Sequence, residues 1–192
     1  IDKVRLADDA SPLYCSAAEG HMDCVVALLR ADASPNLPMR NGATPLLIAA
    51  ECGYKHIIAA LLTGGARVDS AKQNGVTALF ASCKQGHEAC CRLLLGANAC
   101  PDQASLVASP LWIAAHNGHV TCMQLLFGAS ADVNATALDR TTSLWAAAFN
   151  GHIDAVHLLI SCSASVEMAS CAGVTPFAIA CWSGHGQVAA LL

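Results

Sequence analysis

The sequence lacks the features that mark membrane spans, nucleic-acid binding and catalysis. No apolar run approaches the roughly 18 residues that a membrane helix needs, and no secretion signal opens the chain. Charged residues make up only 12% of the chain, and the net charge of −4 is spread without long runs. The chain also has no G-x-S-x-G, P-loop or G-x-G-x-x-G pattern. We therefore expect no enzyme, no cofactor, and neither nucleic acid nor a membrane as partner.

The sequence does contain one block that occurs six times at nearly constant intervals of 33, 33, 32, 33 and 33 residues. A Ser or Thr suited to capping a helix begins each block, and a glycine suited to ending that helix closes it nine residues later. The blocks begin at Ser11, Thr44, Thr77, Ser109, Thr142 and Thr175. A helix of about two turns is too short to be stable alone, so the period predicts a solenoid of stacked units.

The block, written out as Thr44-Pro-Leu-Leu-Ile-Ala-Ala-Glu-Cys-Gly-Tyr54, resembles the ankyrin repeat. The Thr-Pro-Leu starts, the Ala-Ala pairs and the Gly-His ends carry this resemblance over nearly the whole chain. The resemblance implies an all-α solenoid of helix–turn–helix units with short β-hairpins, stacked into a curved array that binds other proteins. The family's usual His after Thr-Pro-Leu is missing from every copy, which removes the family's Thr–His hydrogen bond. The residues in its place are Tyr14, Leu47, Phe80, Trp112, Trp145 and Ala178.

We expect residues 1–192 to form a single ankyrin-repeat domain. Its units are 11–43, 44–76, 77–108, 109–141, 142–174 and a partial unit at 175–192, and residues 1–10 are the end of a preceding unit. The 77–108 unit is one residue short, and the loss lies between Asp102 and Ser109, where we expect a distorted hairpin. Since both ends interrupt a unit, we expect the chain to come from a longer parent protein.

The eleven cysteines follow the repeat and do not follow metal-ligand spacing. Cys83 and Cys181 share a helix position with alanines, whereas Cys24, Cys90 and Cys122 share another with aliphatic residues. No C-x-x-C pair is present. We therefore expect small buried hydrophobes with free thiols, and from them a reducing compartment, which is intracellular and either cytoplasmic or nuclear.

Among the remaining candidates for chemistry, one cysteine and two histidines stand out. Cys52 falls in a position that is polar in other units, so we expect it to be the most readily alkylated thiol. His116 and His119 have the spacing of a metal pair, but no third ligand accompanies them, and His119 belongs to the repeated Gly-His ending. We expect no metal site.

The resemblance also implies where a partner binds, because in the ankyrin family the inner ends of the first helices and the hairpin tips line a concave face. Phe149 and Trp182 occupy a position that carries Glu51 and Lys84 in other units, so we expect both aromatics to be exposed. We expect the two aromatics to form an apolar anchor with Leu138, and Glu51 and Lys84 to set the register in which the partner binds. Alternatively, the two aromatics cover a neighbouring repeat. The expected partner-binding residues are Glu51, Lys84, His116, Asn117, Leu138, Phe149, Asn150 and Trp182.

The resulting functional prediction is a scaffold or recognition module for protein–protein interaction. One alternative is a regulatory or substrate-recruiting segment of a larger enzyme, a ubiquitin-ligase adaptor or a channel. A second alternative is a modified substrate, because Leu126 precedes Asn134 by eight residues in an arrangement that resembles ankyrin sites of asparaginyl hydroxylation. The sequence leaves both alternatives open.

Overall fold

A computed structural model describes residue 2 and residues 9–192 of the chain, and the described part is helical. Most of the segment that we expect to end a preceding unit, residues 1–10, lies outside the described residues. The helices of the first three repeats are α1 (Pro12–Ala18), α2 (Met22–Arg30), α3 (Pro45–Glu51), α4 (Lys55–Thr63), α5 (Ala78–Gln85) and α6 (Glu88–Gly96). Those of the last three are α7 (Pro110–His116), α8 (Val120–Gly128), α9 (Ser143–Asn150), α10 (Ile153–Ser161), α11 (Pro176–Trp182) and α12 (Gly186–Leu191).

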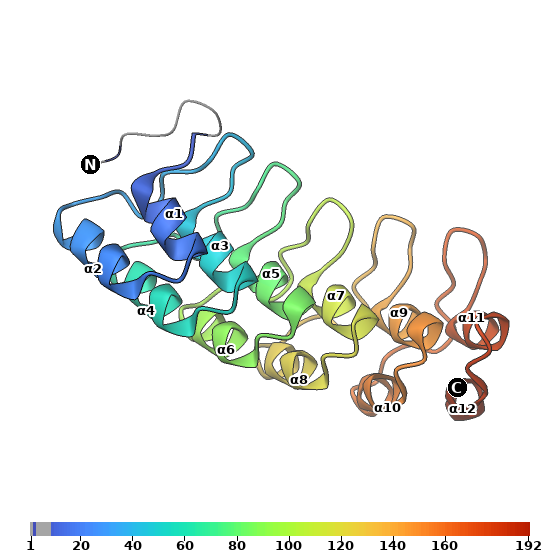
Figure 1. Cartoon of the computed structure of the whole chain (residues 1–192). Helices are drawn as coiled ribbons and strands as arrows, with labels where there is room; N and C mark the ends of the chain where they lie inside the picture. Colours follow the sequence, from blue (N-terminus) through green and yellow to red (C-terminus); the bar gives the residue numbers. More distant parts are fainter. Residues whose placement is uncertain (1, 3–8) are drawn as a thin grey trace. The chain divides into compact units, whose positions relative to one another are not determined.

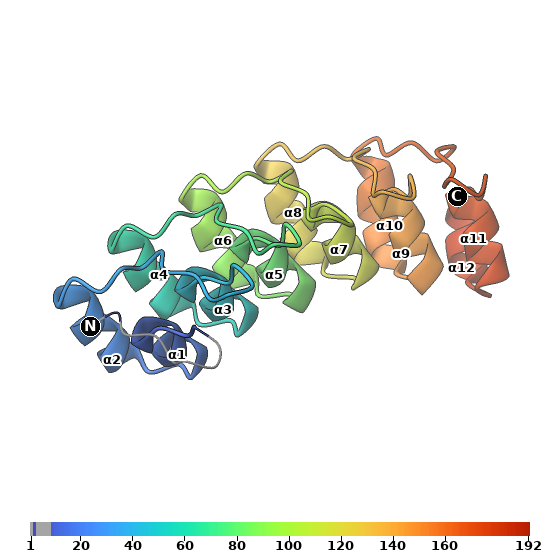
Figure 2. The same cartoon turned by 90° about the horizontal axis from the view of Figure 1, so that it is seen from above.

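The chain divides into two compact units, residues 1–100 and residues 101–192. In unit 1, α1, α3 and α5 pack side by side in one layer, and α2, α4 and α6 pack in a second layer (Figure 1). In unit 2, α7, α9 and α11 form one layer, and α8, α10 and α12 form the other (Figure 2). Each repeat thus supplies one helix to each layer, and the boundary between the units falls in the 77–108 repeat.

The first helix of every repeat begins where the sequence predicts. The side-chain oxygen of the Ser or Thr accepts a hydrogen bond from the backbone N–H three residues later, and the Pro that often follows needs no such partner. Thr44, for example, accepts from the N–H of Leu47 at 3.3 Å. The second helix of the first repeat begins at Met22, directly after the Gly-His ending of the block.

The Gly-His ending has a structural role that links one repeat to the next. Gly151 has a φ of +72°, and a Cβ there would lie only 2.5 Å from Nδ1 of His185. The absence of a side chain lets the His185 ring lie over this turn and place its Nε2 3.0 Å from the carbonyl oxygen of Phe149. His152 makes the same contact with the carbonyl oxygen of His116, so this glycine and histidine act as a pair.

The hairpin loops contain very little β-structure. Among the described residues, the only β pairing is an isolated bridge between Thr136 and Thr142. Each regular loop is closed by a backbone hydrogen bond across four residues, at 39–43, 72–76, 137–141 and 170–174. The shortened loop instead closes across three, from the N–H of Ser105 to the carbonyl of Ala108 at 2.9 Å. The expected distortion of this hairpin is therefore confirmed.

Leucines at two positions of each repeat fill the space between the layers, and those of the inner repeats are completely buried. They include Leu46, Leu61, Leu79 and Leu94 in unit 1, and Leu111, Leu126, Leu144 and Leu159 in unit 2. Phe177 occupies one of these positions in the last repeat but is half exposed, although α11 packs against α9 and α12.

The expectation that the cysteine thiols are buried is correct for only some of the eleven cysteines. All eleven cysteines are free, and Cys83, Cys90 and Cys122 are buried as predicted. Cys24 and Cys181 are exposed, although they occupy the same repeat positions; Cys24 lies on α2, which packs against α1 and α4, and Cys181 on α11, which packs against α9 and α12. Burial at these positions thus depends on the surroundings of each helix and not on the repeat motif itself.

Among residue 2 and residues 9–192, no helix combines the length and the apolar character that crossing a bilayer requires.

Candidate functional site

The expected charged residues of unit 1 lie around one small cavity at the ends of α3 and α5. Glu51 and Lys84 both line this cavity of about 120 Å³, together with Lys72 from the following hairpin loop. The Lys72 ammonium lies 3.5 Å from Oε2 of Glu51, which makes a partly exposed ion pair. This lysine was not anticipated from the sequence, although its place in the loop after α3 puts it beside the end of that helix.

The hairpin tips of unit 1 are polar and bonded to one another. The backbone N–H of Gln73 donates to the carbonyl of Asn41 at 3.0 Å, and its side-chain amide donates to the carbonyl of Arg40 at 3.0 Å. The Arg40 side chain lies 3.6 Å from the carboxylate of Asp9, as an exposed ion pair. The tips of unit 1 therefore present hydrogen-bonding groups that are already held in place.

In unit 2, His116 is the best-ordered polar member of the expected set. Its ring stacks on Trp112 with 5.0 Å between the centroids, and its Nδ1 accepts a hydrogen bond from the Asn150 side-chain amide at 3.0 Å. Burial, and next the charge of His152, lower the pKa of His116 below its ordinary 6.5. Asn117 donates its side-chain amide to the carbonyl of Ile113 at 2.8 Å, and so caps its own helix.

The two aromatics predicted to be exposed are exposed. Trp182 has 75% of its surface accessible and Phe149 has 42%. They occupy the same repeat position on α9 and α11, two helices that pack side by side, so they lie on the same face of unit 2. The Phe149 ring stacks on Trp145, with 5.5 Å between centroids and planes inclined by 10°, which holds it in one orientation.

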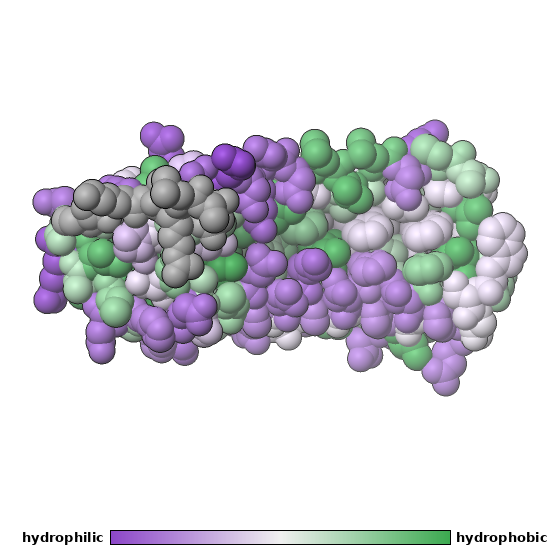
Figure 3. Space-filling model, turned by 45° about the horizontal axis from the view of Figure 1, so that its top comes forward, coloured by the Kyte–Doolittle hydropathy of each residue, from purple (hydrophilic) through white to green (hydrophobic). Residues whose placement is uncertain are grey.

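The hairpin tips of unit 2 add further apolar surface. Leu138 is 79% exposed, and its backbone N–H donates to the carbonyl of Val107 at 3.2 Å, so the tips of two successive loops lie side by side. Leu106 and Val107 are 61% and 63% exposed. Figure 3 shows hydrophobic surface gathered over these loop tips. Val107 was not among the expected partner-binding residues, because the shortened loop shifts its tip by one residue. The missing residue in the 77–108 unit is the sequence signal that could have predicted this shift.

The described part of the chain contains no cluster of side chains that could hold a metal ion. No three His, Cys, Asp or Glu side chains converge in residue 2 or residues 9–192. Asn134, the candidate for hydroxylation, uses its side-chain oxygen to accept the N–H of Ser165 at 2.9 Å. Asn134 therefore has a structural role in joining the fourth repeat to the fifth.

The thiol of Cys52 is exposed, but it is not the most reactive type of thiol. Partial burial, and next the charges of Glu51 and Glu19, raise its pKa, which lowers the fraction of reactive thiolate at neutral pH. Four other cysteines are exposed as well. The raised pKa argues against the expectation that Cys52 is alkylated first, which stays a prediction, whereas Cys83 is fully buried, as the repeat register predicts.

Comparison with known proteins places this chain in a family. The family model for ankyrin repeats matches residues 2–72, 59–137 and 111–192, and the chain therefore belongs to the ankyrin-repeat family. Among solved structures it is similar to the human ASB11 ankyrin repeat domain, with a TM-score of 0.87 and 29% sequence identity over 95% of this chain and 82% of that one. A search of curated proteins found no significant match. Ankyrin repeats are generally protein–protein interaction modules.

Proposed function

We propose that this chain is a recognition module that binds a partner protein through the ends of its first helices and its hairpin tips. The observation that supports this most directly is the pair Phe149 and Trp182, because large exposed aromatics on one face are unusual unless a partner covers them. Neither residue fills the core, and neither caps a helix. We further propose that the six repeats act as one domain in an intracellular protein, since eleven free thiols suit a reducing compartment.

The two aromatics would supply most of the binding energy. Binding energy in protein interfaces concentrates in a few desolvated aromatic residues, each contributing roughly 2 kcal/mol or more when truncated. Stacking on Trp145 leaves Phe149 little rotamer freedom to lose on binding. Leu138, at a loop tip of the same unit, adds apolar surface that a partner would cover.

The polar members of the set would orient the partner. Glu51 and Lys84 lie around one cavity in unit 1, and charges near the rim of an interface favour one register and accelerate encounter more than they add affinity. His116, Asn117 and Asn150 form a hydrogen-bonded border at the helix ends of unit 2. Asn150 is tied to His116 and to the carbonyl of Ala146, so it presents a fixed surface.

Site-specific photocrosslinking in the cell tests this proposal. A photoreactive phenylalanine analogue at position 182 should capture a defined protein, and Phe149→Ala in the same chain should weaken that capture at least tenfold. The matched control places the analogue at Asp154, an exposed residue of α10 in the same unit. Equal capture of the same protein at both positions, or capture unaffected by Phe149→Ala with the melting temperature unchanged, would contradict the proposal.

A further inference from the structure

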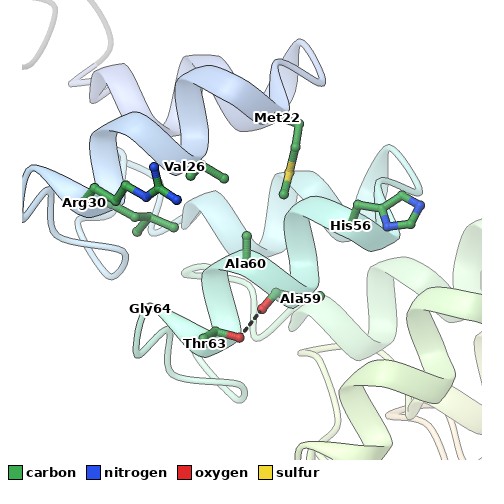
Figure 4. Close-up of a pocket in the computed structure, with 9 residues that line it drawn as sticks. Met22, Val26, Arg30, His56, Ala59, Ala60, Thr63 and Gly64 are labelled. Carbon is green, nitrogen blue, oxygen red and sulfur yellow. Dashed lines mark hydrogen bonds between the residues drawn. The ribbon is translucent and has the colours of Figure 1, made fainter.

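Unit 1 contains an apolar groove on its second layer of helices, away from the helix ends and loop tips discussed above. It runs between α2 and α4, which pack side by side, and has a volume of about 540 Å³. In Figure 4, Met22 and Val26 project from α2 toward Ala59 and Ala60 of α4. The remaining lining residues are Leu29, Arg30, His56, Thr63 and Gly64.

The groove exists because α4 carries two alanines where later repeats carry larger side chains. Ala59 and Ala60 correspond to Arg92 and Leu93 one repeat later, on α6. Arg92 lies across its own helix, with its guanidinium 2.7 Å from the carboxylate of Glu88. Gly64 completes the hollow, since a Cβ there would meet Leu29 at 3.0 Å. The small side chains of Ala59 and Ala60 thus leave space on the α4 side of this groove.

Arg30 is the formally charged residue in the lining of the groove, with histidine counted as neutral. Arg30 lies at the end formed by the last turn of α2, and His56 lies at the opposite end, in the first turn of α4. No carboxylate is among the nine lining residues. Asp23, the acidic residue in the first turn of α2, lines a separate hollow formed by residues 20–24. An occupant with a carboxylate near Arg30 would therefore find a cation without a competing anion in the lining.

The dimensions of the groove suit one helix. Its wall α2 has nine residues and is therefore roughly 13 Å long at about 1.5 Å per residue, which is two to three helical turns. An apolar channel between two parallel ridges of side chains accepts a third helix, whose residues at i, i+3, i+4 and i+7 fill it.

We propose that this groove binds an amphipathic helix of a partner protein, two to three turns long, with an acidic residue beside Arg30. This function is separate from partner recognition at the helix ends. A second copy of this chain suits the groove poorly, because a symmetric pairing of two grooves would supply no carboxylate from either lining to face Arg30 of the other copy. A short fatty acid would share the apolar and anionic chemistry, and the experiment distinguishes it.

Selection from a phage library of random 16-residue peptides, displayed against the complete chain, tests the proposal. The selected peptides should share an apolar i, i+3, i+4, i+7 stripe and be enriched in Asp and Glu at one end. A synthetic selected peptide should bind at least tenfold more weakly to Ala60→Leu, which restores the leucine that later repeats carry. It should also bind at least tenfold more weakly to Arg30→Glu, as measured by fluorescence anisotropy.

Two matched controls separate filling of the groove from general damage. Ala27→Leu makes the same substitution at the same repeat position of α2, where the residue is exposed and does not line the groove. Arg67→Glu reverses an exposed charge elsewhere in unit 1. Both variants should bind the peptide as the unmodified chain does.

Three results would overturn the proposal. The first is a selected set without acidic enrichment, or peptides that bind Ala60→Leu as tightly as the unmodified chain. The second is that the selection yields no peptide while decanoate binds to the unmodified chain, which would assign the groove to a small amphiphile. The third is a dimer in sedimentation that Ala60→Leu converts to a monomer, which would assign the groove to a second copy.

Discussion

Unit 1 and unit 2 have the same helix pairs, the same caps and the same buried leucines, yet their helix ends and loop tips differ in kind. In unit 1, Glu51 pairs with Lys72, and the loop tips are polar and bonded to each other. In unit 2, Phe149 and Trp182 occupy the helix ends, and leucine and valine occupy the tips. The two surfaces are built on one backbone pattern, so residues outside the caps and the core can vary without altering the fold.

The largest expected effect is a loss of stability on removing a buried leucine, and it should be similar in both units. A loss in only one unit would contradict the view that the two units have the same core. Leu61 and Leu126 occupy the same repeat position, one in each unit, and both are completely buried. We expect Leu61→Ala and Leu126→Ala each to lower the free energy of unfolding by about 2–5 kcal/mol, because each leaves a cavity. Urea denaturation followed by circular dichroism measures both. A loss below about 1 kcal/mol in either variant would show that its unit does not rely on this core.

The second effect exchanges the character of the two surfaces. Phe149→Glu and Trp182→Lys place in unit 2 the residue types found at that position in unit 1. The affinity for a captured partner should fall at least tenfold, since each aromatic anchor contributes roughly 2 kcal/mol. Stability should change little for Trp182→Lys and fall by about 1 kcal/mol for Phe149→Glu, which loses its stacking on Trp145. Unchanged affinity in the double variant would assign recognition to another surface.

A third, smaller effect concerns hydrogen bonds that indole N–H groups make in unit 2, because unit 1 has no tryptophan at the corresponding position. The indole N–H of Trp145 donates to the carbonyl of Val174 at 3.1 Å, in the loop of the next repeat. Tyr14, Leu47 and Phe80 occupy this position in unit 1. We expect Trp145→Phe to lower the free energy of unfolding by about 1 kcal/mol, because the carbonyl loses its partner. The exchange of the Gly173 and Val174 backbone amides, followed by mass spectrometry, should accelerate; unchanged exchange would show that the bond does not order the loop.

The fourth effect is a dependence on pH that should be confined to unit 2. The pKa of His116 is lowered in the folded chain, so its contribution to stability is present above pH 6.5 and is lost as the pH falls through the folded-state pKa. Asn150→Asp replaces a donor to Nδ1 with a carboxylate, which should raise the pKa of His116. An NMR titration of the ring protons measures this change. A pKa that stays the same or falls would show that Asn150 does not face the ring in solution.

The smallest effect is a difference in the rate of cysteine alkylation. Cys52 of unit 1 and Cys171 of unit 2 are both exposed, but partial burial and, next, the nearby carboxylates raise the pKa of Cys52. We expect iodoacetamide at neutral pH to label Cys171 before Cys52, and Cys52 before the buried Cys83. Mass spectrometry of briefly labelled protein gives the order. Glu19→Gln should accelerate the labelling of Cys52, and labelling of Cys83 first would contradict the packing of α5.

The sequence alone determined the features that depend on local geometry. The capping Ser and Thr residues and the glycine turns are set by residues within about ten positions of one another, and the periodic pattern shows each of them six times. The one interval of 32 residues marks the shortened loop. The repeat register predicted that Phe149 and Trp182 are exposed, because charged residues occupy their position in other repeats.

Only the tertiary structure decided which atoms meet between repeats, because those contacts join residues about thirty positions apart whose side chains vary independently. It exposed Cys24 and Cys181, although the same motif positions are buried in inner repeats. It paired Lys72 with Glu51 and turned the Trp145 indole toward the next loop. It also left a groove between α2 and α4, where two alanines of one repeat face the valine and methionine of another. Each repeat specifies its own helices, and the stacking of neighbours determines the surface that they present.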